Sequence, residues 1–161
     1  MNYWLMKSEP QVYSIKDLQQ EKKTVWDGVR NYQARNFLRQ MKEGDISFFY
    51  HSNTKPPGIV GLMRVIKSGV DDPTQFDRNS KYYDPKSTPK SPRWQTVVVE
   101  FVEIFSRNIS LEELKQKFIP EELLVVKKGN RLSVMPVDVI VAEKILGIIS
   151  GDSNEDAIVN R

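Results

Sequence analysis

Residues 24–36 bring together an indole, a carboxylate, a glycine and two arginines. A turn needs the glycine, because glycine adopts backbone angles that other residues avoid. It does not need Trp26 before the glycine, or Arg30 and Arg35 after it. One interpretation is that Trp26 forms the wall of a pocket and that the following helix places positive charge beside its mouth. The other is a core tryptophan next to a solvated helix face, and the residue types alone leave both open.

The residues available for catalysis are few. His51 is the sole histidine and cysteine is absent, which excludes a zinc site built from histidines, thiolate metal ligands and a cysteine nucleophile. Ser52 follows His51 directly, and adjacent residues on a strand point to opposite faces, so Ser52 is poorly placed for activation by His51. Ser8 or Ser133 could still take that place. No paired carboxylates and no phosphate-binding glycine motif are evident. We therefore expect no catalytic residue, no cofactor and no metal.

Aromatic residues stand at the edges of the expected elements, interleaved with basic residues. The aromatic set is Trp4, Trp26, Trp94, Tyr50, Tyr82 and Tyr83, and the basic set is Lys7, Arg30, Arg35, Arg93 and Arg131. Such a combination suits a site that stacks a base and neutralises phosphate. A base outside its stack also needs hydrogen bonds to its edge. Trp26 could supply the wall, and Asp27, Asn31, Ser8 and Ser52 the polar contacts.

The length and composition describe an ordinary globular domain. The chain has 161 residues, of which 39% are hydrophobic and 28% charged. No apolar run approaches the roughly 18 residues that a membrane span needs, and the N-terminus lacks the pattern of a signal peptide. We expect no membrane partner and a cytoplasmic location. The net charge of +3 suits a phosphate-facing surface, although many proteins without a polyanion partner share it.

The order of the expected elements predicts an α+β domain. We expect strands at residues 3–7, 46–51, 58–66 and 94–105, and shorter strands at 123–126 and 132–134. Capping boxes predict helices that begin at Ser14 and Ser110. A helical period predicts another helix over residues 34–41, and Pro136 marks the start of the last one. Residues 71–93 hold four prolines and no clear period, as binding loops often do.

Several motifs resemble those of EVE-domain proteins, the family of bacterial proteins similar to thymocyte nuclear protein. They are residues 3–10 (YWLMKSEP), 26–36 (WDGVRNYQARN), 48–53 (FFYHSN), 82–87 (YYDPKS) and 131–134 (RLSV). The match runs in order from about residue 2 to residue 146. This resemblance implies a PUA-like fold, a small curved β-barrel with peripheral helices, over residues 1–147. A polar C-terminal tail is expected at residues 148–161.

The resemblance also implies a function. EVE domains are related to YTH readers, which hold a methylated adenine in an aromatic pocket, and Lys7, Ser8 and Trp26 resemble the matching positions. We therefore expect a non-enzymatic module that binds DNA or RNA and reads a modified base, such as modified cytosine in DNA. The expected ligand contacts are Lys7, Ser8, Trp26, Asp27, Val29, Asn31, Tyr50, His51, Ser52 and Ser133, and the expected backbone contacts are Arg30, Arg35, Arg93 and Arg131.

Two other functions stay open. The first is an enzyme that acts on a modified nucleobase or nucleotide, with His51 or Asp27 as its base. The second is a protein-interaction domain that uses the loop at residues 71–93.

Overall fold

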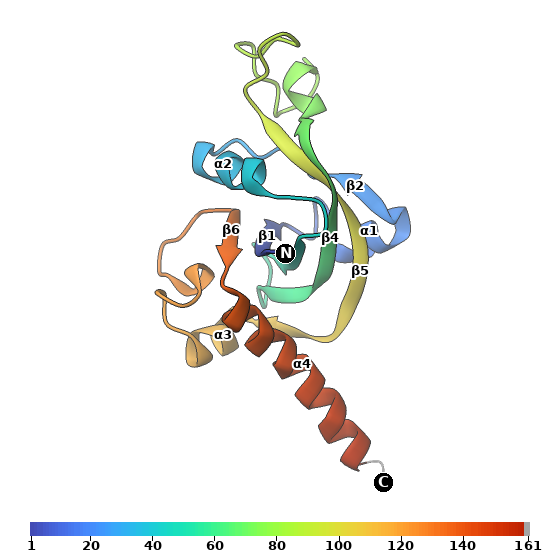
Figure 1. The fold of residues 1–161 in the computed structure, drawn as a ribbon, viewed down its shortest axis with the longest axis vertical. Coiled ribbons are helices and arrows are strands. Elements are labelled where there is room, and N and C mark those ends of the chain that lie inside the picture. The colour runs from blue at the N-terminus through green and yellow to red at the C-terminus, as the bar shows by residue number, and fades with distance from the viewer. Residues whose placement is uncertain (160–161) are drawn as a thin grey trace.

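The computed structural model shows six strands in one mixed sheet, in the order β2-β5-β4-β3-β1-β6 (Figure 1). The structure describes the backbone of residues 1–159 and the side chains of residues 1–151. The strands are β1 (Tyr3–Ser8), β2 (Lys23–Val25), β3 (Ile46–His51), β4 (Gly58–Asp71), β5 (Gln95–Ser110) and β6 (Val134–Val137). The helices are α1 (Ile15–Glu21), α2 (Tyr32–Gln40), α3 (Leu111–Lys117) and α4 (Val139–Val159), with short 3-10 helices η1 (Pro73–Phe76) and η2 (Leu124–Val126).

Strand β1 lies inside the sheet, because it pairs in parallel with β3 and antiparallel with β6. The remaining pairs, β2–β5, β5–β4 and β4–β3, are antiparallel. The long strands β4 and β5 shift register at several points, and such bulges bend and twist a sheet. The sheet therefore curls, as Figure 1 shows, but its end strands β2 and β6 do not pair with each other. The expected α+β class with a small curved sheet is confirmed, although the sheet is not a closed barrel.

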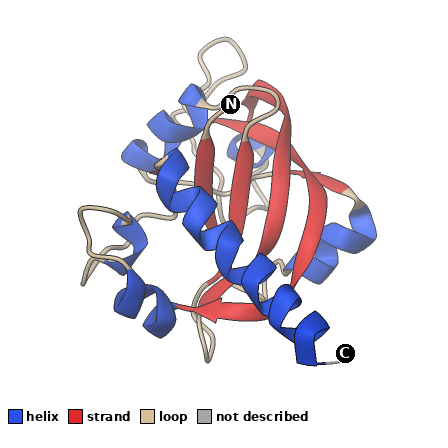
Figure 2. Ribbon diagram, turned by 60° about the horizontal axis from the view of Figure 1, so that its bottom comes forward, coloured by secondary structure: helices blue, strands red, loops and turns tan. Residues whose placement is uncertain are grey.

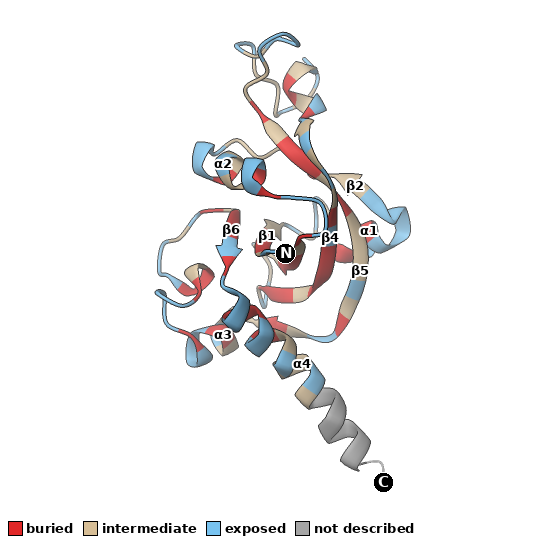
Figure 3. Ribbon diagram, in the orientation of Figure 1, coloured by how far each residue is buried: buried red, intermediate tan, exposed pale blue. Residues whose placement is uncertain are grey.

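Both faces of the central strands are covered. Adjacent residues on a strand point to opposite faces, yet Leu5 and Met6 of β1 are both fully buried, as are Phe48 and Phe49 of β3. Figure 2 shows the helices arranged around the sheet, and Figure 3 shows burial concentrated along its strands. The helices contribute buried residues to the same core: Ile15 and Leu18 from α1, Ala34 and Leu38 from α2, and Val141 and Ile145 from α4.

The expected helix starts agree with the structure in two places. Ser14 forms a reciprocal capping box with Asp17 at the start of α1. Ser110 accepts a hydrogen bond from the backbone N–H of Glu113 at the start of α3. Each bond satisfies an N–H that a helix end would otherwise leave unpaired. Strand β3 has the expected bounds.

Other expectations were wrong. Residues 124–126 form η2, and β6 begins at Val134, whereas we expected strands at 123–126 and 132–134. Pro136 lies within β6, and α4 begins only at Val139. An edge strand tolerates proline because one of its sides needs no ladder N–H. Helix α4 runs without a break past residue 147, and the side chains of residues 152–161 lie outside the described part. The domain boundary at 147 therefore stays a prediction.

The segment 72–94 connects β4 to β5 and is organised around the fully buried Gln75. The side-chain amide of Gln75 donates to the carbonyls of Asp72 and Trp94, at 2.8 Å each. Its side-chain oxygen accepts from the backbone N–H groups of Arg93 and Trp94. One buried amide thus joins the two ends of a segment for which the sequence predicted no regular structure.

Candidate functional site

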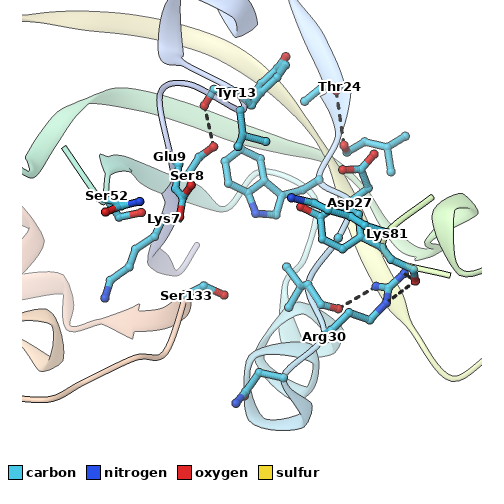
Figure 4. Close-up of a pocket in the computed structure, with 18 of the residues that line it drawn as sticks. Lys7, Ser8, Glu9, Tyr13, Thr24, Asp27, Arg30, Ser52, Lys81 and Ser133 are labelled. Atoms are coloured by element: carbon cyan, nitrogen blue, oxygen red, sulfur yellow. Dashed lines mark hydrogen bonds between the residues drawn. The ribbon is translucent and has the colours of Figure 1, made fainter. Parts of the chain in front are cut away.

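A cavity of about 680 Å³ opens between the ends of β1, β2 and β3 and the segment 72–94. We call it the pocket. Its lining is Lys7, Ser8, Glu9, Val12, Tyr13, Glu21, Thr24, Val25, Trp26, Asp27, Gly28, Val29, Arg30, Asn31, Ser52, Asn53, Lys81, Tyr82, Arg131 and Ser133. Figure 4 shows Lys7, Ser8 and Ser52 on one side of it. On the other side lie Asp27, Arg30 and Lys81.

The turn after β2 supplies much of the lining and is held at both ends. The backbone N–H of Trp26 donates to the Val97 carbonyl at 3.0 Å, and the Thr96 hydroxyl donates to the Trp26 carbonyl. Gly28 has a φ of +83°, a backbone conformation that residues other than glycine rarely adopt. The backbone N–H of Gly28 donates to Asp72 Oδ2 at 2.8 Å. The turn is therefore fastened to β5 and to the start of the segment 72–94.

Trp26 is largely a core residue and yet lines the pocket. It is 7% exposed, and its ring makes edge-to-face contacts with Tyr13 and Phe49 at centroid distances of 6.5 and 5.4 Å. Both interpretations of the sequence therefore hold in part, because Trp26 packs in the core and also borders a cavity. In this conformation it offers the pocket a small part of its surface and no whole ring face.

Arg30 is fixed in place by the segment 72–94. Its Nε and Nη2 donate to the Tyr82 carbonyl, Nη2 also donates to the Thr74 hydroxyl, and Nη1 donates to Val29 O and Asp72. The guanidinium also lies over the rings of Tyr82 and Trp94, at 5.8 and 5.1 Å from their centroids. These contacts use all five N–H groups of an arginine. A phosphate would have to compete with these bonds, although Arg30 does line the pocket and its side chain is 21% exposed. Its contact with a nucleic-acid backbone stays a prediction.

Two charged side chains of the pocket have shifted acidities. Burial lowers the pKa of Lys7, whose Nζ lies 5.7 Å from the centroid of the Tyr50 ring. Desolvation by burial, and then the charge of Asp72, raise the pKa of Asp27, while the charge of Arg30 acts in the opposite direction. Charged groups held partly out of water are common at functional sites, because a ligand can replace the lost solvation.

The smaller polar groups divide into engaged and free ones. The Ser8 hydroxyl donates to the Tyr13 carbonyl at 2.6 Å, and Asn31 Oδ1 accepts from Ala34 N–H as the N-cap of α2. The hydroxyls of Ser52 and Ser133 have no side-chain hydrogen bond within residues 1–151. The backbone N–H of Lys7 donates to the Ser133 carbonyl, which brings residues 7 and 133 to the same wall. Val29 also lies in the lining, as expected.

The structure leaves Tyr50 and His51 out of the lining. Tyr50 is 3% exposed, and the Nε2 of His51 accepts a hydrogen bond from the backbone N–H of Ile15 at 3.2 Å. Burial lowers the pKa of His51, which favours the neutral ring that can accept this bond. His51 thus stabilises the start of α1 rather than facing the cavity, because β3 ends there and the chain enters the pocket only at Ser52.

Of the other expected basic residues, only Arg131 lines the pocket, and it is exposed. Arg35 and Arg93 lie outside the pocket lining, beside the first turn of α2. There the ring of Tyr32 stacks on Trp94 at a centroid distance of 5.0 Å. Arg35 lies over both rings and donates to the Arg93 carbonyl. Arg93 bonds the Tyr32 hydroxyl and lies 3.5 Å from a carboxylate oxygen of Asp84. The structure therefore divides the basic residues between two places.

Sequence reasoning missed Tyr13, Thr24, Lys81 and Tyr82 as lining residues. A signal existed for Tyr82, which belongs to one of the aromatic motifs. Its ring lies so close to Gly28 that a Cβ there would come within 2.7 Å of it. This long-range contact between two motifs is what joins the segment 72–94 to the pocket.

Within residues 1–151, no group of three or more His, Cys, Asp or Glu side chains is placed to hold a metal ion. Among the described residues, no helix has the length and apolar character needed to cross a bilayer.

The model of the EVE domain family matches residues 2–148. The chain belongs to the EVE domain family. This EVE domain is 55% identical over 154 residues to thymocyte nuclear protein 1 of Rattus norvegicus, covering 84% of this chain and 68% of the relative. It also resembles a crystal structure from Pseudomonas syringae, with 51% identity, a TM-score of 0.87, and coverage of 91% of this chain and 98% of the other.

A further similar structure is that of human THYN1 in complex with DNA containing 5-methylcytosine. It is 43% identical to this EVE domain, with a TM-score of 0.86, and the match covers 92% of this chain and 97% of the other. These likenesses confirm both the resemblance seen in the sequence and the PUA-like fold.

Proposed function

We propose that this EVE domain is a non-enzymatic module that binds DNA and holds a modified cytosine in the pocket beside Trp26. The observation that carries the proposal is a cavity of about 680 Å³ bordered by Trp26, Asp27 and Gly28. The chain that forms it is similar to a protein crystallised with DNA containing 5-methylcytosine. Its volume lies within the roughly 300–1,000 Å³ typical of small-ligand sites. The proposal implies an intracellular location with access to nucleic acid, such as the cytoplasm.

The charges around the pocket support a polyanion partner. Lys81 and Arg131 are exposed lining residues, and they come from segments far apart in the sequence. Lysine and arginine at such positions contact phosphates and fix the orientation of the strand without reading its sequence. We propose that Lys81 and Arg131 contact the backbone around a base that enters the pocket. Arg35 and Arg93 lie farther along, over α2, and could extend that contact.

Catalysis receives less support. His51, the candidate base, accepts a hydrogen bond from α1 and does not line the pocket. Asp27 does line it, but no other residue of the described part makes a side-chain hydrogen bond with its carboxylate that would orient it as a base. A reader needs neither group as a base, because recognition requires stacking and hydrogen bonds alone.

The test is a set of titrations with labelled oligonucleotides of one sequence, as DNA and as RNA, that carry cytosine or 5-methylcytosine at one position. We expect tighter binding of the methylated DNA, at low salt and at physiological salt alike. Backbone contacts are common to both oligonucleotides, so salt should weaken both by the same factor. Equal affinity for the two bases would refute a reader and leave a basic surface. Tighter binding of methylated RNA than of methylated DNA would reassign the substrate.

The matched variants are Trp26→Phe and Phe37→Leu. Trp26→Phe keeps an aromatic ring in the core and removes the indole N–H that borders the pocket. We expect it to weaken binding of the methylated base and reduce the preference for it. Phe37 lies on α2, packs against Trp4 of β1 and does not line the pocket. Phe37→Leu should therefore change stability without changing the preference for the methylated base.

A further inference from the structure

Two adjacent lining residues, Trp26 and Asp27, carry polar side-chain atoms that no other described residue engages, although the backbone N–H of Asp27 bonds to its own carboxylate. The indole N–H groups of Trp4 and Trp94 donate to Asp45 at 2.9 Å and to Asp84 at 2.7 Å. The indole N–H of Trp26 has no acceptor within the described side chains, although the residue is 93% buried. Among those side chains the one enclosed polar atom without a partner is Asn108 Oδ1. The Trp26 N–H is therefore not enclosed, and the pocket is the space that it borders.

The acceptor is the carboxylate of Asp27. Three acidic residues line the pocket, and one of them, Glu21, accepts a hydrogen bond from the Tyr13 hydroxyl at 2.7 Å. Asp27 forms no ion pair and no side-chain hydrogen bond with another residue in the described part. Arg30 is close enough to act on it electrostatically, but the guanidinium is bonded to Asp72, 3.0 Å away. Arg30, the cation that acts on Asp27 electrostatically, is thus bound by Asp72 instead.

An unpaired carboxylate beside a site for a polyanion is unfavourable on general grounds. It repels phosphate and so lowers the affinity for every DNA sequence alike. Such a group contributes only if it makes a contact that one base offers and another refuses. Glu9, the remaining acidic residue of the lining, is exposed, as Asp27 is, and lies in the turn after β1.

The chemistry of an ionised carboxylate limits what Asp27 can recognise. It accepts hydrogen bonds and donates none. Cytosine carries an exocyclic amino group, which donates, where thymine carries a carbonyl oxygen, which accepts. The methyl group of 5-methylcytosine is also present in thymine. A pocket that recognised the methyl group alone would therefore bind thymine throughout the genome, so a reader of 5-methylcytosine needs a second contact at the amino group.

We propose, on the basis of the function proposed above, that Asp27 selects the base. Its carboxylate accepts a hydrogen bond from the exocyclic amino group of a 5-modified cytosine. The indole N–H of Trp26 donates to an acceptor of the same base. The two residues act as a donor and an acceptor supplied by one fastened turn. Thymine is refused because its carbonyl oxygen would face the carboxylate.

The experiment compares duplexes that carry 5-methylcytosine, cytosine or thymine at one position, each opposite an abasic site so that no base pair has to be broken. Asp27→Asn is the variant, and Glu9→Gln is its control, since it removes the same charge from the same lining. We expect the unmodified protein to prefer 5-methylcytosine over thymine by roughly tenfold or more. Asp27→Asn should abolish or reverse this preference, because an amide can donate to the thymine carbonyl.

A second readout separates selection from charge. Both variants lose one negative charge, so both should bind a duplex that carries an abasic site in place of the base more tightly, and by similar factors. Glu9→Gln should keep the preference for 5-methylcytosine over thymine. Equal binding of 5-methylcytosine and thymine by the unmodified protein, or an unchanged preference in Asp27→Asn, would overturn the inference.

The inference and the proposed function fail in different ways. A protein that binds 5-methylcytosine and cytosine equally is no reader of the modification, whatever Asp27 does. One that separates those two bases, but whose Asp27→Asn variant still refuses thymine, is a reader that selects the amino group by another residue. Absence of binding to any duplex would overturn both.

Discussion

Asp72, the first residue of the segment 72–94, binds the turn after β2 that lines the pocket. Replacing Asp72 by asparagine should destabilise the protein. The residue is 2% exposed. Its Oδ2 accepts from Gly28 N–H at 2.8 Å and from Arg30 Nη1 at 3.0 Å, and its Oδ1 accepts from the backbone N–H and the hydroxyl of Thr74. In Asp72→Asn, one of the two oxygens becomes an NH₂ group. Whichever way the amide turns, a donor then faces donors on one side.

The magnitude follows from the loss of one member of a buried ion pair. Such a loss removes about 3–5 kcal/mol, because the partner is left with an uncompensated charge. The Arg30 side chain is 21% exposed and keeps its bonds to Tyr82 and Thr74, which favours the lower end of that range. We therefore expect a loss of about 3 kcal/mol, or roughly 6–12 °C in the melting temperature of a domain of this size.

The assay is urea and thermal denaturation of Asp72→Asn beside Asp71→Asn. Asp71 is the neighbouring residue, and it is exposed. Its replacement removes the same charge, and should change stability by no more than about 0.5 kcal/mol. Equal melting temperatures for the two variants would refute the reasoning, since they would mean that the bonds to Gly28 and Arg30 contribute no net stability. At temperatures where Asp72→Asn is still folded, we also expect weaker DNA binding, because the pocket turn has lost its fastening.

Three further outcomes are expected. Gly28→Ala should lower stability more than Gly44→Ala: both glycines have positive φ, but a Cβ meets the Tyr82 ring only at Gly28, so differential scanning calorimetry of the pair isolates the clash. Hydrogen bonds from Arg107, with help from Lys117, lower the pKa of Glu113 to about 2. The stability that this gives is present above the ordinary pKa of 4.5 and is lost as pH falls towards 2, so Glu113→Gln should flatten the acid limb of the stability curve, with less than about 1 kcal/mol of change at neutral pH. The pKa of Asp27 is raised in the folded protein, so its ionisation opposes folding. Asp27→Asn should therefore raise the melting temperature at neutral pH, and the gain should vanish below the unfolded pKa of about 3.9; a gain that persisted there would contradict this account.

The sequence predicted those features that depend on neighbouring residues. The Ser14 capping box needs only residues 14–17, and the apolar run at residues 46–51 identifies β3 without reference to its partners. The turn at Trp26-Asp27-Gly28 could be recognised from the sequence, because an indole beside a glycine is visible locally, but whether Trp26 borders a pocket or packs in the core was left open. Neither the depth of burial of Trp26 nor its unpaired N–H could be predicted, since both depend on Tyr13, Phe49 and the absence of an acceptor nearby.

The features that the sequence could not show depend on contacts between distant residues. Arg30 resembles a phosphate ligand until Asp72, 42 positions away, is found to bind it. His51 resembles a pocket residue until α1 is seen to use its ring nitrogen. The run at residues 123–126 is as apolar as a strand, but it forms η2 and buries Val125 and Val126 without a partner strand. A local sequence pattern shows which residue types are present, whereas contacts with distant residues determine what each of them does in the folded protein.

The central position of β1 also governs when the pocket can form. Tyr3 pairs with Val137 across the β1–β6 ladder, and Lys7 bonds Ser133, so one wall of the pocket joins residues from opposite ends of the sequence. At a synthesis rate of about 5–20 residues per second, β1 leaves the ribosome roughly 7–27 s before β6. During that interval the edge of β1 that β6 will cover is open to pairing with other chains. Pairings between such distant strands also slow folding. Nascent chains therefore cannot bind the base until β6 has emerged, and agents that cover an open strand edge should raise the yield of folded protein.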